Sequence, residues 1–217
     1  MADAEPVAIS NRTPLPDGRS SVLQMQGVAP DAGDLESLIL LLSLNPRTSC
    51  KMYGKVVQRP RHEAVFGKKG IGWEGYAYGK PPVLIKAEKT MHPLVQRVLD
   101  HANSHLRKDG EGEFTWALAN LYFKGSDYVS WHADDEADVG GDSVPTYSFG
   151  CERRFLVRKK ASTSSSGKRG RDDVFEFSAK HGSCIVMQGC DFQKDWEHCV
   201  PKTAKPCGPR LSITPRK

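Results

Sequence analysis

The sequence predicts a mainly β, α+β fold in which a double-sheet jelly-roll barrel carries helices on one side. Two segments with helical periodicity lie in the first half of the chain, and from residue 114 onward short strand-like segments alternate with turns. A helical preamble followed by many short strands is typical of such layered β folds. With 217 residues, the chain is long enough for one domain with a full hydrophobic core.

Composition and charge are those of an ordinary globular protein. Hydrophobic residues make up 38% of the chain and charged residues 26%. The formal net charge of +5 fits a polyanionic partner such as a nucleic acid, although a mild surplus of lysine is common. No secretory signal is visible, and the longest apolar stretch, residues 38–44, is too short to span a bilayer. We therefore expect a soluble protein that does not enter a membrane.

The six cysteines indicate reduced thiols in an intracellular protein. None forms a Cys-x-x-Cys pair, and a chain of this size needs no disulfide staples. A zinc site is the alternative, but its candidate ligands match no ribbon or finger spacing: Cys190, His198, Cys199 and Cys207.

Residues 1–33 are predicted to form a loosely ordered leader. They mix Pro, Gly, Ser and Asp with scattered apolar residues and show no sustained periodicity. The main domain is placed at residues 34–217, and we expect hairpins within it at about residues 50–80.

Two helices are expected before the strands. Asp34 is a candidate cap for a short helix over residues 35–44, and Pro46 prevents its continuation. A longer amphipathic helix is expected over residues 92–108, with Pro93 suited to its first turn.

Aromatic residues, glycines and cations are interleaved in the hairpin region. Aromatic faces stack on bases while lysine and arginine contact phosphates, so the pattern fits a nucleic-acid surface. Half-buried tyrosines beside solvated lysines would fit it equally well. A flexible cationic linker at residues 159–171 could likewise follow a phosphate backbone or form a hairpin tip.

His132 and Asp134 are candidate metal ligands. Side chains two positions apart in a strand point to the same side, so an imidazole and a carboxylate can reach one ion. His198 is the best candidate for the third ligand. Two histidines and one carboxylate on one face of a metal leave the opposite face open, as in non-haem Fe(II) oxygenases. His101 and His105, one helical turn apart, are expected to be exposed instead.

The last predicted strand carries four polar residues on one face: Arg210, Ser212, Thr214 and Arg216. Arginine matches carboxylates, often bidentately, so a small dicarboxylate beside the metal would use both cations. The alternative is a terminal strand whose polar face is open to solvent. Asn120 and Tyr122 also share a strand face and could hydrogen-bond a carboxylate or keto oxygen.

Taken in chain order, these elements resemble the AlkB family of Fe(II)/2-oxoglutarate dioxygenases, and in particular its eukaryotic members that repair alkylated DNA. The resemblance covers residues 52–216 and includes Ser148-Phe149-Gly150. It implies a double-stranded β-helix core with flanking N-terminal helices. It also implies that Fe(II) is bound by His132, Asp134 and His198. The residues implied to bind 2-oxoglutarate are Asn120, Tyr122, Arg210, Thr214 and Arg216.

The resemblance also implies contacts to a flipped base. The implied base-binding residues are Tyr53, Gly54, Lys55, Tyr76, Ala77, Tyr78 and Asp135. Contacts to the nucleic-acid backbone are implied for Arg61, Lys168 and Arg169. The implied reaction uses 2-oxoglutarate and O2 to demethylate bases such as 1-methyladenine and 3-methylcytosine, with release of succinate, CO2 and formaldehyde.

Other functions remain open at this stage. The same chemistry could act on methylated RNA or on a protein side chain, although the aromatic and basic segment favours a nucleic acid. A barrel that binds nucleic acid without catalysis has no need of the three ligands, and a zinc-stabilised binding domain would differ in its metal. We expect a monomer, acting on alkylated DNA in the nucleus.

Overall fold

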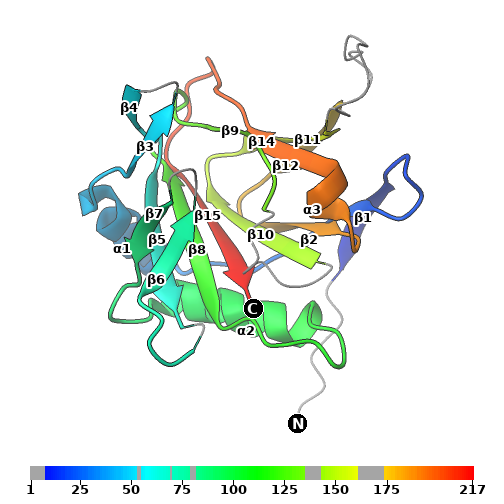
Figure 1. Cartoon of the computed structure of the whole chain (residues 1–217), viewed down its shortest axis with the longest axis horizontal. Coiled ribbons are helices and arrows are strands. Elements are labelled where there is room, and N and C mark those ends of the chain that lie inside the picture. The colour runs from blue at the N-terminus through cyan, green and yellow to red at the C-terminus, as the bar shows by residue number, and fades with distance from the viewer. Residues whose placement is uncertain (1–7, 53–54, 69, 79–81, 135–142, 161–173) are drawn as a thin grey trace.

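The computed structural model describes residues 8–52, 55–68, 70–78, 82–134, 143–160 and 174–217 (Figure 1). These residues form fifteen strands and three helices. The elements are, in chain order, β1 (Ile9–Pro14), β2 (Ser21–Gln26), α1 (Ala32–Leu44), β3 (Ser49–Met52), β4 (Lys55–Gln58), β5 (His62–Gly67), β6 (Gly75–Tyr78), β7 (Val83–Lys86), α2 (Pro93–His105), β8 (Trp116–Tyr122), β9 (Val129–His132), β10 (Ser143–Gly150), β11 (Arg153–Lys159), β12 (Val174–Ala179), β13 (Ser183–Gln188), α3 (Phe192–Asp195), β14 (Trp196–Val200) and β15 (Arg210–Arg216).

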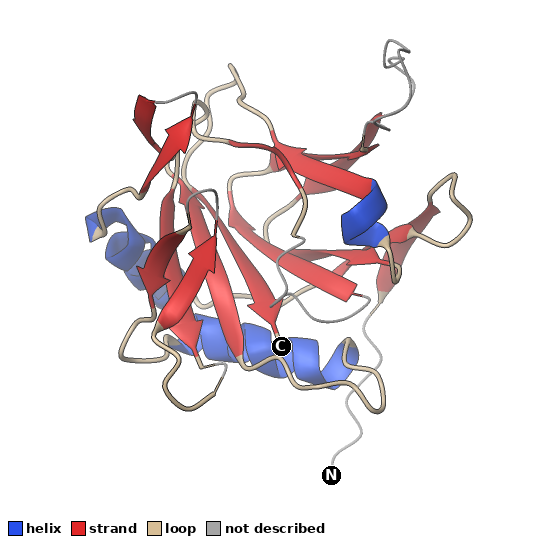
Figure 2. Cartoon of the chain, in the orientation of Figure 1, coloured by secondary structure: helices blue, strands red, loops and turns tan. Residues whose placement is uncertain are grey.

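Two antiparallel sheets form the barrel. The larger has seven strands in the order β1-β2-β13-β10-β15-β8-β5, and the smaller has four in the order β12-β11-β14-β9. Helices α1 and α2 contact the larger sheet, and Figure 2 shows both on the side away from the smaller sheet. The predicted class, a mainly β jelly-roll with helices on one side, is confirmed.

Two hairpins, β3–β4 and β6–β7, stand apart from the main sheets. Hairpin β3–β4 lies in the region where hairpins were expected, at about residues 50–80, whereas β6–β7 begins there and extends to Lys86. A small apolar cluster fixes β6–β7 against the end of the larger sheet: Val65, Tyr76, Ile85, Trp116 and Leu118. Its buried aromatic rings hold the hairpin close to strands β5 and β8.

Apolar residues pack on both faces of the larger sheet. One core lies between this sheet and the helices, and it includes Leu38, Leu42, Leu94, Val98, Leu211 and Ile213. The other lies between the two sheets, and it includes Val22, Tyr122, Phe155, Val157, Phe177, Ile185 and Trp196. The inter-sheet layer therefore has an apolar frame around any polar groups that the strands direct into it.

Strand β15 lies between β8 and β10 in the larger sheet. Leu211 and Ile213 point into the helix-side core. Because side chains alternate along a strand, the residues between them point to the opposite face, into the space between the sheets. The alternation of β15 therefore directs a row of polar side chains to the interior of the barrel. The alternative of a polar face open to solvent is wrong, since every residue of β15 is buried.

The N-terminal segment differs from the predicted loose leader over residues 1–33. Strands β1 and β2 extend the larger sheet, and β2 pairs with β13. Val22 packs in the inter-sheet core while Leu23 and Met25 pack in the helix-side core. A strand covered on both faces has no polar and apolar alternation, and its partner is distant in sequence, so local periodicity could not reveal it.

Helix α1 begins at Ala32, with Asp31 at the N-cap position, so the predicted cap at Asp34 is wrong. Asp34 lies in the first turn, where its carboxylate meets the Arg97 side chain of α2 at 2.7 Å. His101 on α2 is also not exposed as expected: it is half-buried, and its Nδ1 hydrogen-bonds with the Tyr147 hydroxyl at 2.8 Å. Among the described residues, no helix is both long and apolar enough to cross a membrane.

Helix α1 provides a test of the helix-side core. Leu38 is fully buried, whereas Leu40 on the same helix is 60% exposed. We expect Leu38→Ala to lower the free energy of unfolding by roughly 2–5 kcal/mol through cavity formation. Leu40→Ala should change it by less than about 0.5 kcal/mol. Urea denaturation of both variants measures the difference, and equal effects would contradict the packing described.

Candidate metal centre and adjoining pocket

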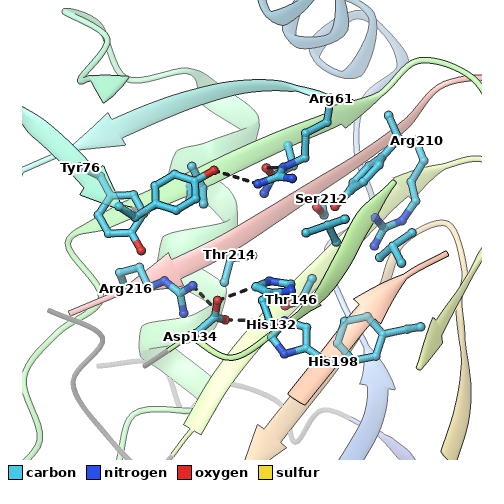
Figure 3. Close-up of a pocket in the computed structure, with 17 residues that line it drawn as sticks. Arg61, Tyr76, His132, Asp134, Thr146, His198, Arg210, Ser212, Thr214 and Arg216 are labelled. Atoms are coloured by element: carbon cyan, nitrogen blue, oxygen red, sulfur yellow. Dashed lines mark hydrogen bonds and ion pairs between the residues drawn. The ribbon is translucent and has the colours of Figure 1, made fainter. Parts of the chain in front are cut away.

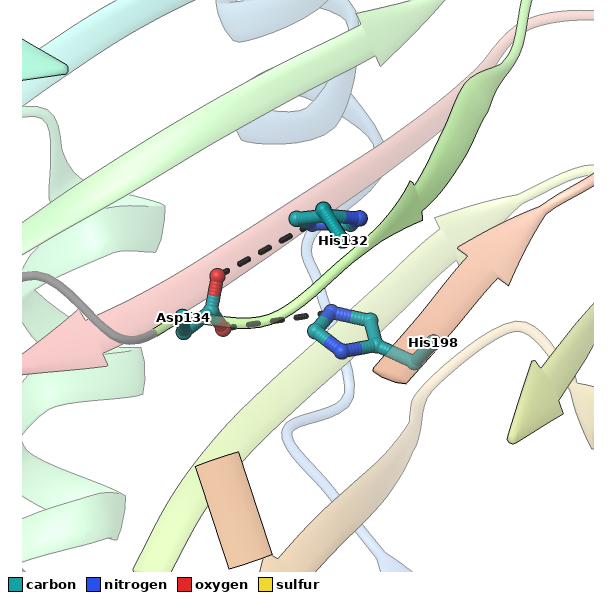
Figure 4. Close-up of side chains that lie close together, drawn as sticks. All are labelled: His132, Asp134 and His198. Atoms are coloured by element: carbon teal, nitrogen blue, oxygen red, sulfur yellow. Dashed lines mark ion pairs between the residues drawn. The ribbon is translucent and has the colours of Figure 1, made fainter. Parts of the chain in front are cut away.

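Strands β9 and β14 bring two histidines together from distant parts of the chain. His132 and His198 are directly opposite each other in the antiparallel pairing, and their ring centroids are 4.2 Å apart. Asp134 follows β9 by two residues. The Nε2 atoms of His132 and His198 lie 3.8 and 3.9 Å from the two Asp134 carboxylate oxygens (Figure 4). One possible ligand atom from each residue lies within 4.8 Å of the others.

Hydrogen bonding prepares His132 for a metal. Its Nδ1 lies 2.9 Å from the backbone carbonyl oxygen of Ser130. A carbonyl only accepts, so Nδ1 carries the proton and the Nε2 lone pair faces Asp134. This arrangement, in which a backbone acceptor fixes the tautomer, is common for metal-binding histidines.

His198 is held in its neutral form. Its ring is buried and stacks on Phe155 at a centroid distance of 5.3 Å. Burial, together with the neighbouring His132, lowers the pKa of His198 to about 3. At neutral pH the imidazole is therefore uncharged, which is the form that binds a metal.

Asp134 remains ionised although it is enclosed. Burial by itself would raise its pKa, but the Arg216 guanidinium outweighs that effect and holds the pKa well below its usual range. The Arg216 Nη2 lies 3.0 Å from the carboxylate. The Asp134 backbone N–H donates to the Gln193 side-chain carbonyl at 2.9 Å. Both the charge and the position of this ligand are thus fixed from outside the triad.

Two imidazoles and one carboxylate form the donor set of a non-haem iron site with one face left open. His198 and Asp134 are held in the protonation states that a metal requires. The donor chemistry therefore fits Fe(II).

Arg210 occupies the other end of β15 and shares one pocket with the triad (Figure 3). Its Nη2 donates to Ser148 Oγ at 3.0 Å, and the guanidinium lies 5.0 Å from the Tyr122 ring centroid. Burial lowers the pKa of Arg210, which still remains charged. Within the described part of the chain, its Nε and Nη1 have no hydrogen-bond partner. A buried cation with unpaired donors favours an anionic ligand in the pocket.

Most sequence-predicted residues converge on this pocket. Besides the triad, its lining includes Asn120, Tyr122, Arg210, Thr214, Arg216, Tyr76 and Tyr78. A cleft of about 740 Å³ adjoins it, and Lys55 and Trp131 lie along that cleft together with His132. Several predicted residues lie outside the described ranges: Tyr53, Gly54, Asp135, Lys168 and Arg169.

Two of the predicted substrate contacts are placed differently. Ala77 is exposed and lies on the face of β6 opposite to Tyr76 and Tyr78, so it does not line the pocket. Arg61 was expected to contact the nucleic-acid backbone; it is largely buried and lines both the pocket and the adjoining cleft. Its Nε donates to Asn120 Oδ1 at 2.9 Å. Acceptors inside the site pair with this cation, and a contact with nucleic acid at the cleft stays a prediction.

Sequence reasoning assigned no role to several residues of the site. Thr146 and Ser212 line the pocket, and Ser148 accepts a hydrogen bond from Arg210. Strand periodicity did place Ser212 on the polar face of the last strand, and the same reasoning could have placed Ser148 on an inward face. No local signal identifies Gln193, because its contact with Asp134 joins α3 to a residue 59 positions earlier in the chain.

Comparison with known proteins agrees with this geometry. A profile of the 2OG-Fe(II) oxygenase superfamily matches residues 24–216. DNA oxidative demethylase ALKBH2 of Arabidopsis thaliana is 34% identical over 183 residues, covering 77% of this chain and 56% of the relative. Alpha-ketoglutarate-dependent dioxygenase alkB homolog 3 of Homo sapiens is 29% identical over 158 residues, covering 72% and 51%. The chain thus spans about half the length of these relatives.

A solved structure is also similar in fold. The crystal structure of an oxidoreductase of the 2OG-Fe(II) oxygenase family from Burkholderia pseudomallei superposes with a TM-score of 0.52. The match covers 90% of this chain and 84% of that chain at 16% sequence identity. At this level of identity the similarity shows the fold alone.

The triad leads to a prediction about metal binding. We expect His132→Ala to weaken Co(II) binding by more than about 100-fold, since loss of outer partners alone costs 10–100-fold. His105→Ala is the matched control, because it removes a half-buried imidazole of α2 that is not part of the triad. Isothermal titration with Co(II) measures both constants, and an equal loss in the two variants would reject the assignment.

Proposed function

The chain belongs to the 2OG-Fe(II) oxygenase superfamily, within its AlkB family, and we propose that it removes methyl groups from alkylated nucleic-acid bases by oxidation. The cofactors of this family are Fe(II), 2-oxoglutarate and O2. The observation that carries the proposal is one pocket lined both by His132, Asp134 and His198 and by the buried Arg210 guanidinium, whose Nε and Nη1 have no hydrogen-bond partner among the described residues.

We assign His132, Asp134 and His198 as the iron ligands. Iron with 2-oxoglutarate and O2 supplies oxidation of a substrate C–H bond, coupled to conversion of 2-oxoglutarate into succinate and CO2. The protein's own groups bind, orient and shield the reactants. Arg216 holds the Asp134 carboxylate at 3.0 Å, and Ser130 orients the His132 ring at 2.9 Å.

The remaining polar lining would bind 2-oxoglutarate. We assign its distal carboxylate to Arg210, since two nitrogen atoms of this guanidinium, Nε and Nη1, have no hydrogen-bond partner and the group has no carboxylate partner among the described residues. Arg216 already pairs with Asp134, so it would contact the co-substrate only with its remaining donors. Asn120, Tyr122 and Thr214 line the wall between the two arginines and would complete the binding site.

The substrate would be a methylated base inserted next to the iron. Hydroxylation of an N-methyl group gives a product that loses formaldehyde and restores the base. The 740 Å³ cleft beside His132 provides space for a nucleotide, and Tyr78 lines both the cleft and the pocket. Its ring could stack on a flipped base. Tyr53 and Asp135, outside the described residues, are proposed as further base contacts.

We propose alkylated DNA as the substrate, because the Arabidopsis relative is named a DNA oxidative demethylase. A DNA substrate would place the protein in the nucleus of a eukaryotic cell. A monomer suffices for the chemistry, since one chain contributes every residue that lines the pocket.

Reconstitution tests the proposal directly. Purified protein is loaded anaerobically with Fe(II) and 2-oxoglutarate, then exposed to air with oligonucleotides that carry 1-methyladenine or 3-methylcytosine. Single- and double-stranded DNA and RNA are compared side by side, with formaldehyde, succinate and repaired base as readouts. We expect repair of methylated DNA by the wild type and none by His132→Ala. Greater repair of RNA would reassign the substrate, and succinate release without repair of any oligonucleotide would reject demethylation.

Arg210 gives an independent test of co-substrate binding. We expect Arg210→Met to raise the dissociation constant for 2-oxoglutarate by roughly 10- to 100-fold, because charged hydrogen bonds are lost. Arg154→Met is the matched control, since Arg154 is exposed and pairs with Glu176. Anaerobic titration calorimetry in the presence of Mn(II) measures both variants. Unchanged binding in Arg210→Met would refute this assignment.

A further inference from the structure

We propose that Glu63 is a positioning residue that holds two parts of the site in register: the Tyr78 ring in the substrate cleft and, through Arg61, the Asn120 amide in the co-substrate pocket. This inference rests on the proposed function for the roles of Tyr78 and Asn120. The arrangement of Glu63 itself is a property of the fold.

Strand pairing places Glu63 at the site. It lies directly opposite Asn120 in the antiparallel pairing of β5 with β8. Paired residues direct their side chains to the same face of a sheet, which here is the face of the pocket. Asn120 in turn is opposite Ser212, and Ser212 is opposite Ser148. A row of polar residues thus crosses four strands at one level, and Glu63 is its only carboxylate.

Donors surround both carboxylate oxygens of Glu63. Oε1 accepts from Arg61 Nη2 at 2.7 Å and from the Tyr78 hydroxyl. Oε2 accepts from Arg59 Nη1 at 3.2 Å and from the Thr48 hydroxyl. Burial by itself would raise the pKa of Glu63, but the Arg61 guanidinium and the two hydroxyl donors outweigh it and lower that pKa. The carboxylate is therefore an ionised hub within a fully satisfied network.

One branch of the network fixes Tyr78. Its hydroxyl donates to Glu63 and accepts from Arg61 Nη2 at 2.8 Å. The guanidinium of Arg59 lies 3.8 Å from the centre of the Tyr78 ring, a cation–π contact. The Tyr76 ring also stacks on Tyr78 at a centroid distance of 5.0 Å, so both the hydroxyl and the ring are engaged and the orientation of Tyr78 is set before any base arrives. Such preorganisation lowers the cost of ordering a stacking residue on binding.

The other branch fixes the orientation of Asn120. Arg61 Nε lies 2.9 Å from Asn120 Oδ1. A guanidinium can only donate, so the amide oxygen must face Arg61 and the amide NH2 must face away from it. The NH2 is thereby directed to the pocket that Asn120 lines, where a carboxylate or keto oxygen of 2-oxoglutarate would accept. Glu63 holds Arg61 in the position that enforces this choice.

The network distinguishes a positioning role from a purely structural one. A structural role predicts loss of stability alone when Glu63 is neutralised. The positioning role predicts two separate binding defects, one for each branch. Because Arg59 and Arg61 would then share a neutral partner, both branches should loosen together.

Glu63→Gln is the primary test, with Glu176→Gln as the matched control for loss of an exposed carboxylate paired with Arg154. We expect Glu63→Gln to weaken 2-oxoglutarate binding about tenfold in anaerobic calorimetry with Mn(II). The KM for a 1-methyladenine oligonucleotide should also rise several-fold, and the control should change neither value. A lower melting temperature with unchanged constants would overturn the proposal.

Variants of the two branches separate their effects. Tyr78→Phe removes only the hydroxyl and should raise the KM for the oligonucleotide more than the dissociation constant for 2-oxoglutarate. Arg61→Lys removes the Nε donor to Asn120. It should raise the dissociation constant for 2-oxoglutarate more than the KM for the oligonucleotide. In the double variant Glu63→Gln/Tyr78→Phe, the KM should equal that of Glu63→Gln alone, because both changes break one interaction. If the two substitutions raise the KM additively, Glu63 and Tyr78 are not coupled and the proposal is overturned.

The branch variants also decide the outcome if Glu63→Gln does not fold. Tyr78→Phe and Arg61→Lys then stand as the test, and identical profiles for the two would overturn the proposal. The calorimetric measurement needs neither nucleic acid nor turnover. If the wild type repairs no methylated base, the proposed function fails while the effect of Glu63 on 2-oxoglutarate binding is still measured.

Discussion

The antiparallel pairing of β9 with β14 is the constraint on which the site depends. It sets His132 opposite His198, and the chain leaving β9 returns Asp134 to within 4 Å of both rings, at 3.8 and 3.9 Å. Three potential ligands bound to one ion must come from a rigid frame if the open face is to point in a fixed direction. Here the smaller sheet holds the two histidines, and Arg216 from the larger sheet holds the Asp134 carboxylate by an ion pair. The metal centre thus spans the two sheets of the barrel.

The larger sheet supplies polar side chains to the site because side chains alternate between its two faces. Leu211 and Ile213 pack against the helices, while the residues that alternate with them face the pocket. The same principle applies across strands, because the row from Glu63 through Asn120 to Ser212 lies at one level of the sheet. One face of the sheet can therefore be apolar, and stabilise the fold, while the other is polar and binds anions. Substitutions on the apolar face should therefore lower stability, whereas substitutions on the polar face should weaken anion binding.

The sequence indicated the parts of the site that lie within one strand or one motif. The spacing of His132 and Asp134, and the period of two along β15, were sufficient to predict shared faces. The link from these strands to His198 came from resemblance to a family, since nothing local joins residues so distant in the chain. Arg61 was assigned to the nucleic-acid backbone from the resemblance alone, and its hydrogen bond to Asn120, a residue distant in the sequence, could not be read from local sequence. Likewise, β2 shows no alternation because both of its faces are covered.

The pairing of β2 with β13 has a consequence for how the molecule is made. Ser21–Gln26 hydrogen-bonds to Ser183–Gln188, so the larger sheet can be completed only after most of the chain has left the ribosome. Contacts between such distant segments raise the contact order and slow folding. Until β13 has been made, β2 can pair only with β1, and its apolar residues Val22, Leu23 and Met25 lack the packing of the complete sheet. An emerging polypeptide with such a segment is prone to self-association. The topology of the barrel therefore delays the full burial of an early strand until a late strand has been made.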